Sequence, residues 1–259
     1  MQDGLEAALA ATETAVQAAQ REAAAATKEL RKAHAAAGTG SVRDLRRALA
    51  AATEAGEALA QAAKEAEASW SFDEAEHLSS GDYARELLAT AAEAGLAMVQ
   101  DDDRLLCYPS LVRLLPAEAA IEIDKRRERR LRPSVVVAAL AAAQARPPKG
   151  KPAALMESLL AAYELLAGDR AEPVLRLDQL WSVLTMLPGA ARDYSKPEFA
   201  RDLYLLDQSD VTASKSGRAL RFHASSGTRG PGVLTTVAKS GQQQRYWGVS
   251  FSGREVHRA

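Results

Sequence analysis

The first 70 residues carry an apolar pattern that alternates in steps of four and three along the chain. Two runs share this pattern, and the stretch HAAAGTGS (34–41) between them holds two glycines that break a helix. A strict seven-residue repeat keeps one seam of a helix facing a partner helix. We therefore predict an antiparallel coiled-coil hairpin over 1–70. Its seam positions are Leu5, Leu9, Thr12, Val16, Ala19, Ala23, Ala26 and Leu30 in the first helix, and Val42, Leu45, Leu49, Ala52, Gly56, Leu59, Ala63, Ala66 and Trp70 in the second.

Small residues dominate this seam, so the helices can approach closely but each Ala layer buries little apolar area. Burial stabilises by about 25 cal/mol per Å², and a Leu layer therefore contributes far more than an Ala layer. We expect a hairpin that is marginal alone and docks on something. Two interpretations stay open: a structural hairpin within one chain, or an arm that binds a protein partner or a second copy.

Residues 71–116 follow a different pattern. A short helix fits 72–78, and a second helix fits 82–94, where Gly95 ends it. Next, LAMVQ (96–100) and RLLCYP (104–109) are typical of two short strands joined by the turn Asp101–Asp103.

A similar order recurs from residue 151. We predict helices over 151–168, 177–187 and 194–210, the last opened by Ser195 as N-cap with Glu198 three residues later. Residues 211–222 read as strand, turn and strand, and the segments 232–238 and 244–251 are also strand-like. Tyr246 and Trp247 fit the packing of such a sheet, and stacking on bases is the alternative.

Helix, glycine, strand, polar turn and strand, in that order, resemble the last helix and the wing of the winged-helix superfamily. The resemblance covers roughly 71–110 and 151–223 and rests on the order of the elements. It implies a mainly α chain with α+β winged-helix modules. The domains would be the hairpin (1–70), a first winged-helix-like domain (71–116), a basic connecting helix and linker (117–150), and a second winged-helix-like domain with a basic, β-rich C-terminus (151–259).

The segment DKRRERRLRPS (124–134) is the densest run of positive charge. We predict that it lies in a helix from about Ala117 to Arg132, which Pro133 ends, with Glu122–Arg126 and Glu128–Arg132 as intrahelical pairs. A solvated connecting helix, a phosphate contact and docking on an acidic protein surface remain open. The stiff linker RPPKGKP (146–152) adds further positive charge nearby.

Neither presumed recognition helix is charged for reading bases, and the turn Asp101–Asp103 would repel phosphates. Residues 213–259, however, contain eight Lys or Arg and a single acid, Glu255. Phosphates attract such a surface whatever the sequence of the DNA. The candidate nucleic-acid-binding residues are Lys125, Arg126, Arg127, Arg129, Arg130, Lys149, Lys151, Lys215, Arg218, Arg221, Arg229, Lys239 and Arg245.

Composition narrows the function classes further. The formal net charge is −1, so any binding of a polyanion must come from local patches. The single cysteine, Cys107, excludes an internal disulfide and fits a reducing cytoplasm, and its place in a predicted strand favours a buried, inert thiol. The chain has no GxxxxGK[ST] or GxSxG motif and no Cys/His cluster spaced for zinc. We therefore expect no enzymatic activity, no cofactor and no metal.

Three hypotheses follow. Tandem winged helices occur in transcription regulators and in non-catalytic subunits of chromosome-organising ATPase complexes and related bacterial defence complexes. The first hypothesis is therefore a bacterial, DNA-associated adaptor subunit that holds a protein partner through the hairpin and first winged helix, and phosphates through its basic segments. The second is a sequence-specific regulator that forms a homodimer through the hairpin. The third is an assembly scaffold without nucleic acid.

Overall fold

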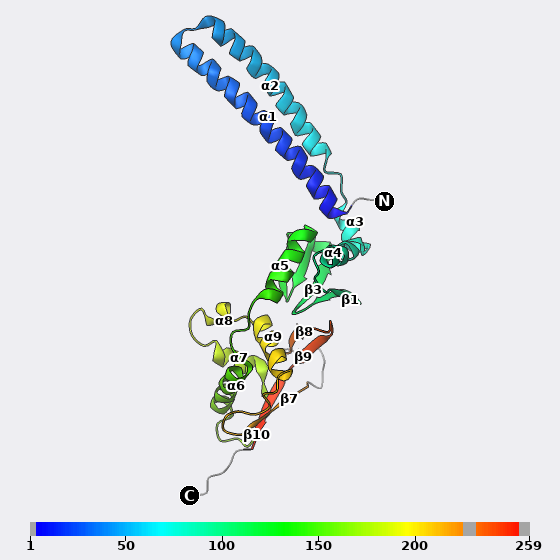
Figure 1. Ribbon diagram of the computed structural model, residues 1–259, viewed down its shortest axis with the longest axis vertical. Helices are drawn as coiled ribbons and strands as arrows, with labels where there is room; N and C mark the ends of the chain where they lie inside the picture. The colour runs from blue at the N-terminus through cyan, green and yellow to red at the C-terminus, as the bar shows by residue number, and fades with distance from the viewer. Residues whose placement is uncertain (1–3, 225–231, 254–259) are drawn as a thin grey trace. The chain divides into compact units, whose positions relative to one another are not determined.

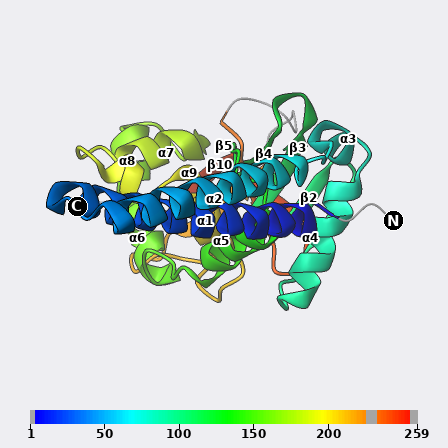
Figure 2. The same ribbon diagram turned by 90° about the horizontal axis from the view of Figure 1, so that it is seen from above.

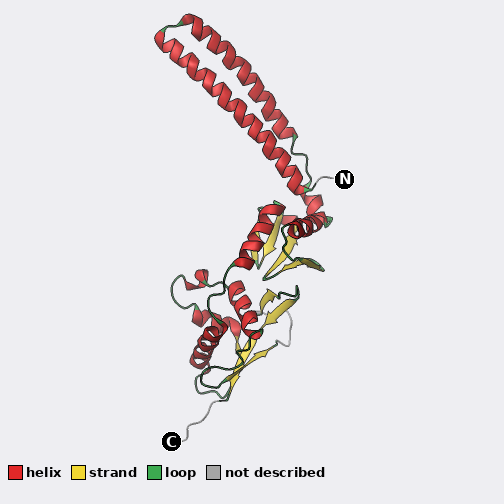
Figure 3. Cartoon of the chain, viewed as in Figure 1, coloured by secondary structure: helices red, strands yellow, loops and turns green. Residues whose placement is uncertain are grey.

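The computed structural model describes residues 4–224 and 232–253 (Figure 1). The chain divides into two compact units, and unit 1 holds the chain up to Leu87 together with Pro116–Ala119 and Arg130–Val135. Unit 2 holds the remainder. Unit 1 is helical, whereas unit 2 combines helices with small antiparallel sheets (Figure 3), which confirms the α+β class.

Two long helices dominate unit 1 and lie side by side (Figures 1 and 2), which confirms the predicted antiparallel hairpin. Helix α1 spans Leu5–Thr39 and helix α2 spans Val42–Ala68. Gly40 separates them with φ of 72°, a left-handed conformation that glycine adopts without strain. Thr12 and Ser69 lie at the same level of the pair, because their hydroxyl oxygens are 3.3 Å apart.

The rows of side chains between the two helices differ in part from the predicted seam. The predicted rows that contain Leu5 and Leu45 are buried or half-buried between the helices, so these are confirmed. The predicted row that starts at Val42 is wrong, because four of its five members are exposed. The row that starts at Leu9 is confirmed only in part, since Leu9 and Ala23 are half-buried whereas Val16 and Leu30 are exposed. The second buried row of α2 is instead formed by Ala48, Ala55, Ala62 and Ser69. The small side chains let the helix axes approach, while Val16, Leu30, Val42 and Leu49 are left exposed.

A polar junction holds the root of the hairpin. Helices α3 (Glu74–Ser79) and α4 (Asp82–Glu93) confirm the two predicted in this region. The Glu86 carboxylate accepts hydrogen bonds from the backbone N–H groups of Leu5 (2.9 Å) and Glu6 (2.8 Å), which caps α1. A Cβ on Gly4 would lie 2.3 Å from Glu86 Oε1, so a larger residue there would displace the Glu86 carboxylate from this position.

Glu6 closes the same junction from the other side. Its carboxylate accepts hydrogen bonds from Arg132 Nε (2.7 Å) and from the backbone N–H of Ser134 (2.8 Å) at the start of helix α5 (Pro133–Ala145). Arg132 also pairs with Glu13 at 2.6 Å. Burial alone would raise the pKa of Glu6, but the hydrogen bonds from Arg132 and Ser134 outweigh it and lower the pKa below its ordinary value of 4.5.

The first sheet of unit 2 is an antiparallel meander of five strands in sequence order, whereas the sequence predicted two. Its strands are β1 (Val99–Asp101), β2 (Arg104–Cys107), β3 (Ser110–Leu115), β4 (Ala120–Ile123) and β5 (Arg126–Glu128). The short 3-10 helix η1 (Pro116–Glu118) lies between β3 and β4 in the chain. The predicted turn Asp101–Asp103 joins β1 to β2, as β1 pairs Asp101 with Arg104.

The predicted helix from Ala117 to Arg132 is therefore wrong. Ile121 and Ile123 alternate with Glu122, a period of two that fits a strand, and Ile121 is fully buried. Asp124 and Lys125 follow with φ of 50° and 66°, which makes the two-residue turn typical of a hairpin. Arg126 pairs across this hairpin with Ile123. The spacing of acids and bases that fits intrahelical pairs belongs to two strands, and Pro133 begins a helix instead of ending one.

The C-terminal part of unit 2 contains the larger core. Its helices are α6 (Pro152–Ala167), α7 (Leu177–Leu184), α8 (Ala190–Asp193) and α9 (Lys196–Asp207). Its strands β6 (Leu175–Arg176), β10 (Gly248–Ser252) and β7 (Ala219–His223) form one sheet in that order, and β8 (Leu234–Val237) pairs with β9 (Gln243–Tyr246). The fully buried Met156, Tyr163, Phe199 and Phe251 lie in this core.

Most predicted elements of this part are confirmed. Ser195 and Glu198 form the expected capping box of α9, and the Ser195 N–H donates to Glu198 Oε2 at 2.9 Å. The first strand expected within 211–222 is reduced to one bridge between Ala213 and Ala219. The single strand expected over 244–251 divides into β9 and β10. Tyr246 is buried in the sheet, where its hydroxyl donates to Asp207 at 2.9 Å, so the expectation that it packs the core is confirmed.

Glu6→Gln tests the junction at the root of the hairpin. The folded pKa of Glu6 is lowered, so its carboxylate stabilises the protein above the ordinary pKa of 4.5 and loses that effect as the pH falls through the folded value. At pH 7 we expect the variant to lose about 1 kcal/mol, because a charged hydrogen bond contributes about 1.5–3 kcal/mol and Glu6 is partly exposed.

Urea unfolding at pH values from about 3 to 7, in steps of about one unit, measures this effect. The difference between wild type and variant should shrink below the ordinary pKa of 4.5. Glu57→Gln, at an exposed position of α2, is the matched control and should change the unfolding free energy little at any pH. A difference that stays constant with pH would contradict the role given to Glu6.

Candidate functional site

Two adjoining cavities in unit 2 form a cleft with a basic lining. The larger, of about 600 Å³, is lined by the first sheet, helices α7 and α9, and strands β8 and β9. The smaller, of about 490 Å³, is lined by the linker 146–149, the α8–α9 connection and Arg126. Arg126 and Ser195 line both, so we call them together the basic cleft. Its cations are Arg104, Arg113, Lys125, Arg126, Arg146, Lys149, Arg192, Lys196 and Arg245, and its acids are Glu122, Asp124, Asp178, Asp193 and Glu198.

The turn between β4 and β5 places Lys125 and Arg126 at the cleft. Asp124 anchors the turn, because its Oδ1 accepts the backbone N–H of Leu111 at 2.9 Å. Burial raises the pKa of Asp124, although the hydrogen bond from Leu111 and the nearby Arg126 act in the opposite direction. Lys125 and Arg126 both expose their side chains. The tight turn thus presents two cations next to a carboxylate that is held inward.

Ion pairs within the first sheet offset part of the positive charge. Arg104 and Arg113 are cross-strand neighbours on β2 and β3. Asp103 forms an ion pair with each of them, with Oδ1 3.4 Å from Arg104 Nε and Oδ2 3.1 Å from Arg113 Nη2. On β9, Gln243 Oε1 accepts from Arg245 at 2.7 Å and lies 3.4 Å from Arg104 Nη1. These arginines line the cleft but have partners in the protein.

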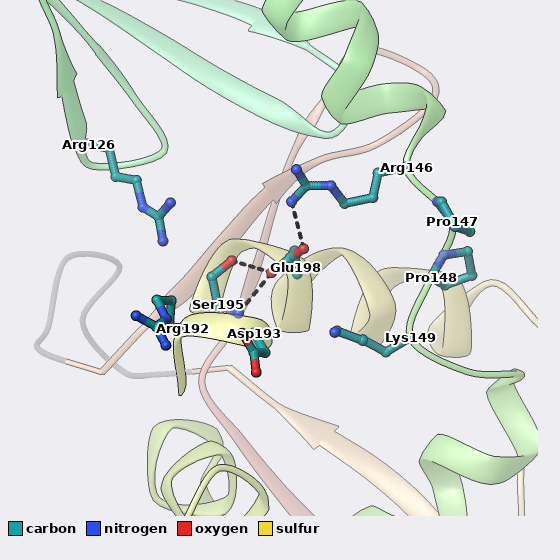
Figure 4. A pocket seen from close by; sticks show the side chains of 9 residues that line it. All are labelled: Arg126, Arg146, Pro147, Pro148, Lys149, Arg192, Asp193, Ser195 and Glu198. Carbon is teal, nitrogen blue, oxygen red and sulfur yellow. Dashed lines mark hydrogen bonds and ion pairs between the residues drawn. The ribbon is translucent and has the colours of Figure 1, made fainter. Parts of the chain in front are cut away.

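The linker forms one wall of the smaller cavity, and a buried arginine holds it. Arg201 is 3% exposed and donates to the backbone carbonyls of Arg146 (2.9 Å) and Pro147 (3.2 Å). Asp202, 5% exposed, pairs with Arg201 at 3.0 Å and accepts the backbone N–H of Lys149 at 3.2 Å. Carbonyls and an N–H of the linker are thereby fixed to α9, which directs Arg146 and Lys149 toward the cavity (Figure 4).

The capping box of α9 forms the floor of the smaller cavity. Glu198 accepts the Ser195 N–H and also pairs with Arg146 at 2.8 Å (Figure 4). Burial would raise the pKa of Glu198, but the bonds from Ser195 and the pair with Arg146 lower it. Figure 4 also shows Arg126 and Arg192 on the other side of this cavity. Arg146 is therefore partly neutralised at the floor.

Five exposed cations of the cleft keep uncompensated charge. They make no ion pair within 4 Å with any described residue: Lys125, Arg126, Lys149, Arg192 and Lys196. Lys196 lies with Nζ 4.9 Å from the centre of the Trp181 ring, a cation–π contact that positions the charge without cancelling it. An excess of positive charge in a cleft attracts anions.

The structure gathers only some of the predicted residues here. Lys125, Arg126, Lys149 and Arg245 line the cleft. Arg127, Arg129, Arg130, Lys151, Lys215, Arg221 and Lys239 do not line either cavity. Arg229 lies outside the described residues. Lys215 and Arg221 are exposed elsewhere on unit 2, and Lys151 is the N-cap of α6.

Arg218 is a correction. It was expected to contact phosphate, but it is only 7% exposed. Its guanidinium lies 3.1 Å from Glu164 Oε1, donates to the Phe251 carbonyl at 3.1 Å, and stacks over the Tyr163 and Phe251 rings. A basic turn rich in Ser and Gly is typical of an exposed loop. Arg218, however, directly precedes β7, and its side chain lies in the core.

Sequence reasoning missed Arg104, Arg113 and Arg192 and gave Lys196 no role in phosphate binding. Arg104 and Arg113 belong to strands that pair in a hairpin, and nine-residue spacing around the Tyr108–Pro109 turn was the available signal for their proximity. Nothing in the sequence brings Lys196 toward Lys125, because the two lie in different parts of the chain and meet through tertiary packing.

Within residues 4–224 and 232–253, no three His, Cys, Asp or Glu side chains come together to hold a metal ion. Cys107 is 1% exposed, and burial, with a smaller effect of Asp124, raises its pKa to about 11. Its thiol is protonated and shielded at neutral pH, as expected. Among the described helices, none combines the length and apolar character needed to cross a bilayer.

No protein-family model matches the chain, and comparison with curated proteins and with solved structures gives no match either. The functional argument therefore rests on the residues of the cleft and the hairpin.

Arg201→Leu tests whether the buried pair builds the cleft wall. The variant leaves Asp202 buried without its cation, which costs about 3–5 kcal/mol. Urea unfolding measures this loss, and Arg221→Leu on the exposed face of β7 is the control, expected to change stability by less than about 0.5 kcal/mol. Equal effects of the two substitutions would show that Arg201 does not anchor the linker.

Asp124→Asn tests the half-buried carboxylate of the turn. The folded pKa of Asp124 is raised, so ionising it costs stability once the pH exceeds its ordinary value of 3.8, and the uncharged Asn avoids this cost. Asn also accepts a hydrogen bond and tolerates positive φ. We expect the variant to be more stable than wild type at pH 7. This gain in the free energy of unfolding should vanish as the pH falls to about 3, below the pKa of Asp in the unfolded chain.

Asp102→Asn is the matched control, since Asp102 also has positive φ (54°) but is exposed in the β1–β2 turn. It separates the turn preference of Asn from the effect of burial. A gain for Asp124→Asn that does not depend on pH would contradict the role of the buried charge.

Proposed function

We propose that this protein is a non-enzymatic, DNA-associated adaptor subunit that holds a phosphate backbone in the basic cleft without reading sequence. The carrying observation is that five exposed cations without an ion pair among the described residues converge there from separate elements. Lys125 and Arg126 come from the β4–β5 turn, Lys149 from the linker, and Arg192 and Lys196 from the α8–α9 region.

The nature of the side chains supports contact with phosphate in preference to base readout. Arg and Lys at a surface neutralise phosphates and release counterions, which provides affinity independent of sequence. The exposed cations sit on a turn, a linker and a helix start. A recognition helix would instead present a row of Arg, Asn or Gln to the edges of bases in the major groove.

The winged-helix resemblance of the C-terminal part belongs to the same proposal. Helices α6, α7 and α9 precede β7, and strands β8 to β10 follow. We propose that this part is a winged-helix-like module whose phosphate contacts lie at the N-terminal end of α9. The first part of unit 2 carries a five-stranded sheet, which is larger than a wing, and we give it the role of a second wall.

The assembly in which such an adaptor works is also part of the proposal. The hairpin of unit 1 supports a role in holding protein partners, since it is long and leaves apolar side chains exposed. A cytoplasmic, bacterial setting fits a chain with one buried cysteine. A chromosome-organising or defence complex is the kind of assembly that needs a subunit of this type.

Charge reversal of the turn tests the proposal. We expect the double variant Lys125→Glu/Arg126→Glu to bind random-sequence duplex DNA at least about tenfold more weakly than wild type. The slope of log affinity against log salt should fall by about 0.9 for each phosphate that the variant no longer neutralises. Fluorescence anisotropy at several salt concentrations measures both quantities.

The matched control is Lys215→Glu/Arg221→Glu, which makes the same change in net charge at exposed positions outside the cleft. If both double variants lose affinity equally, the cleft is not the site. A strong preference of wild type for one DNA sequence would favour a regulator. No binding at low salt would leave a scaffold that contacts only proteins.

A further inference from the structure

The hairpin leaves two apolar rows partly uncovered, with Leu9, Ala23 and Gly56 half-buried and the other members exposed. One row on α1 consists of Leu9, Val16, Ala23 and Leu30, and one on α2 consists of Val42, Leu49, Gly56 and Ala63, continued by Trp70 just beyond the helix. The large side chains are substantially exposed: Val42 by 58%, Leu30 by 56%, Leu49 by 49% and Trp70 by 38%. Each row repeats every seven residues, as rows of a helix–helix interface do.

Both rows lie on the same face of the hairpin. On α1, residue 9 of the exposed row comes one residue after residue 8 and four residues after residue 5, and residues 8 and 5 belong to the two rows that face α2. On α2, residue 49 comes in the same way one residue after residue 48 and four residues after residue 45. An antiparallel pair of helices has an approximate twofold axis perpendicular to the plane of the pair. That axis keeps each face on its own side, so rows with the same relation to the seam share a face. We call it the apolar face.

The opposite face has a different composition. The equivalent rows there are Ala11, Ala18, Ala25 and Lys32 on α1, and Asp44, Ala51, Ala58 and Glu65 on α2. It thus carries only Ala and charged residues. Val, Leu and Trp are concentrated on the apolar face, which the hairpin itself does not need for its own packing.

Gly56 marks the centre of the apolar face. A glycine in the middle of a helix costs about 1 kcal/mol relative to Ala. Nothing lies within 4 Å of where its Cβ would stand, so the hairpin gives no steric reason for glycine. A missing Cβ at the centre of an exposed apolar row allows a second helix to approach closely.

Charge is divided along the length of the hairpin. Residues 28–47 around the tip carry six Lys or Arg and two carboxylates, Glu29 and Asp44. The remaining parts, residues 5–27 and 48–70, carry two Lys or Arg and seven carboxylates. The tip is therefore basic and the root is acidic, so two copies attract each other when the tip of one lies against the root of the other.

We propose that the apolar face binds the same face of a second copy in antiparallel orientation, which forms a four-helix bundle. With the twofold axis at Gly56, Val42 of one copy lies opposite Trp70 of the other, and Leu49 lies opposite Ala63. On α1 the same axis passes near Ala25, because Thr12 and Ser69 lie at the same level. The large side chains of each copy thus meet on either side of a small central residue.

The flanking charges fall in register with this axis. Arg46 and Glu67 lie beside the apolar face, at nearly equal distances along α2 from Gly56. In the bundle, Arg46 of each copy lies opposite Glu67 of the other, as charges that flank a coiled-coil seam do. Helix α1 is about 50 Å long, α2 is about 40 Å long, and each is about 10 Å wide, so together they offer about 900 Å² per copy, which exceeds the roughly 800 Å² per partner of a standard interface.

Single-cysteine variants test both the face and the direction. Cys107 is buried, so an introduced cysteine is the reactive thiol. We expect Gly56→Cys in the full chain to form a covalent dimer under mild oxidation, because the two copies of residue 56 meet at the axis. Ala58→Cys, exposed on the opposite face, is the control and should stay monomeric on a non-reducing gel.

A mixture of Val42→Cys and Trp70→Cys chains should form the mixed disulfide. If Val42→Cys instead links efficiently to itself, the copies lie tip to tip, and the antiparallel arrangement is overturned. Equal cross-linking of Gly56→Cys and Ala58→Cys would overturn the choice of face.

Sedimentation equilibrium tests the interaction without cross-links. Wild type should sediment as a dimer at micromolar concentration, and a monomeric wild type would overturn the proposal. Arg46→Glu should weaken the dimer about fivefold or more, and addition of Glu67→Arg should restore it. Failure of the second substitution to restore the dimer would refute the proposed register. These outcomes do not depend on DNA, so they stand apart from the function proposed for the basic cleft.

Discussion

The buried pair of Arg201 and Asp202 is the interaction on which the basic cleft depends. Two charges removed from water are tolerated only where hydrogen bonds satisfy what remains of them. Here the linker supplies those bonds, through the carbonyls of Arg146 and Pro147 and the N–H of Lys149. A proline-rich connection that could have moved freely is thereby held as a wall, and its cations keep a defined place relative to α9.

The division between compensated and uncompensated charge gives this cleft its character. Arg104 and Arg113 pair with Asp103, and Arg245 donates a hydrogen bond to Gln243. These three arginines line the larger cavity. Lys125, Arg126 and Lys196 project beside them without an ion pair in the part of the chain that the structure describes. A surface charge of this kind attracts phosphate at low salt and releases it as salt rises. Such a cleft suits the adaptor proposed above, which would hold DNA without regard to its sequence.

The hairpin follows a different physical principle. Its seam is closed by small side chains, and close approach of the helices compensates in part for the little area that each layer buries. Leu5, Leu45 and Leu59 lie between the helices, but other large apolar side chains, Val16, Leu30, Val42 and Leu49, are exposed on one face. The marginal stability expected of an Ala seam and the exposed apolar face are therefore two consequences of one choice of residues. A second copy on that face relieves both.

The sequence alone determined the elements whose signals are local. Seven-residue periodicity predicted the hairpin, Gly40 and Gly95 marked helix ends, and Ser195 with Glu198 located the start of α9. It also identified Lys125, Arg126, Lys149 and Arg245 as candidates for the site. These features depend on backbone geometry, turn chemistry and charge within a few residues, all of which a sequence shows.

Tertiary structure decided the rest. Residues 117–132 hold charges at helical spacing, yet pairing with β3 makes Ala120–Ile123 a strand, since Ile121 gains burial that an exposed helix would not give. Packing also turned Arg218 inward onto the Tyr163 and Phe251 rings. It selected which of two apolar rows on each hairpin helix became the seam. In each case the local pattern allowed more than one arrangement, and burial against distant residues, which no local pattern records, made the choice.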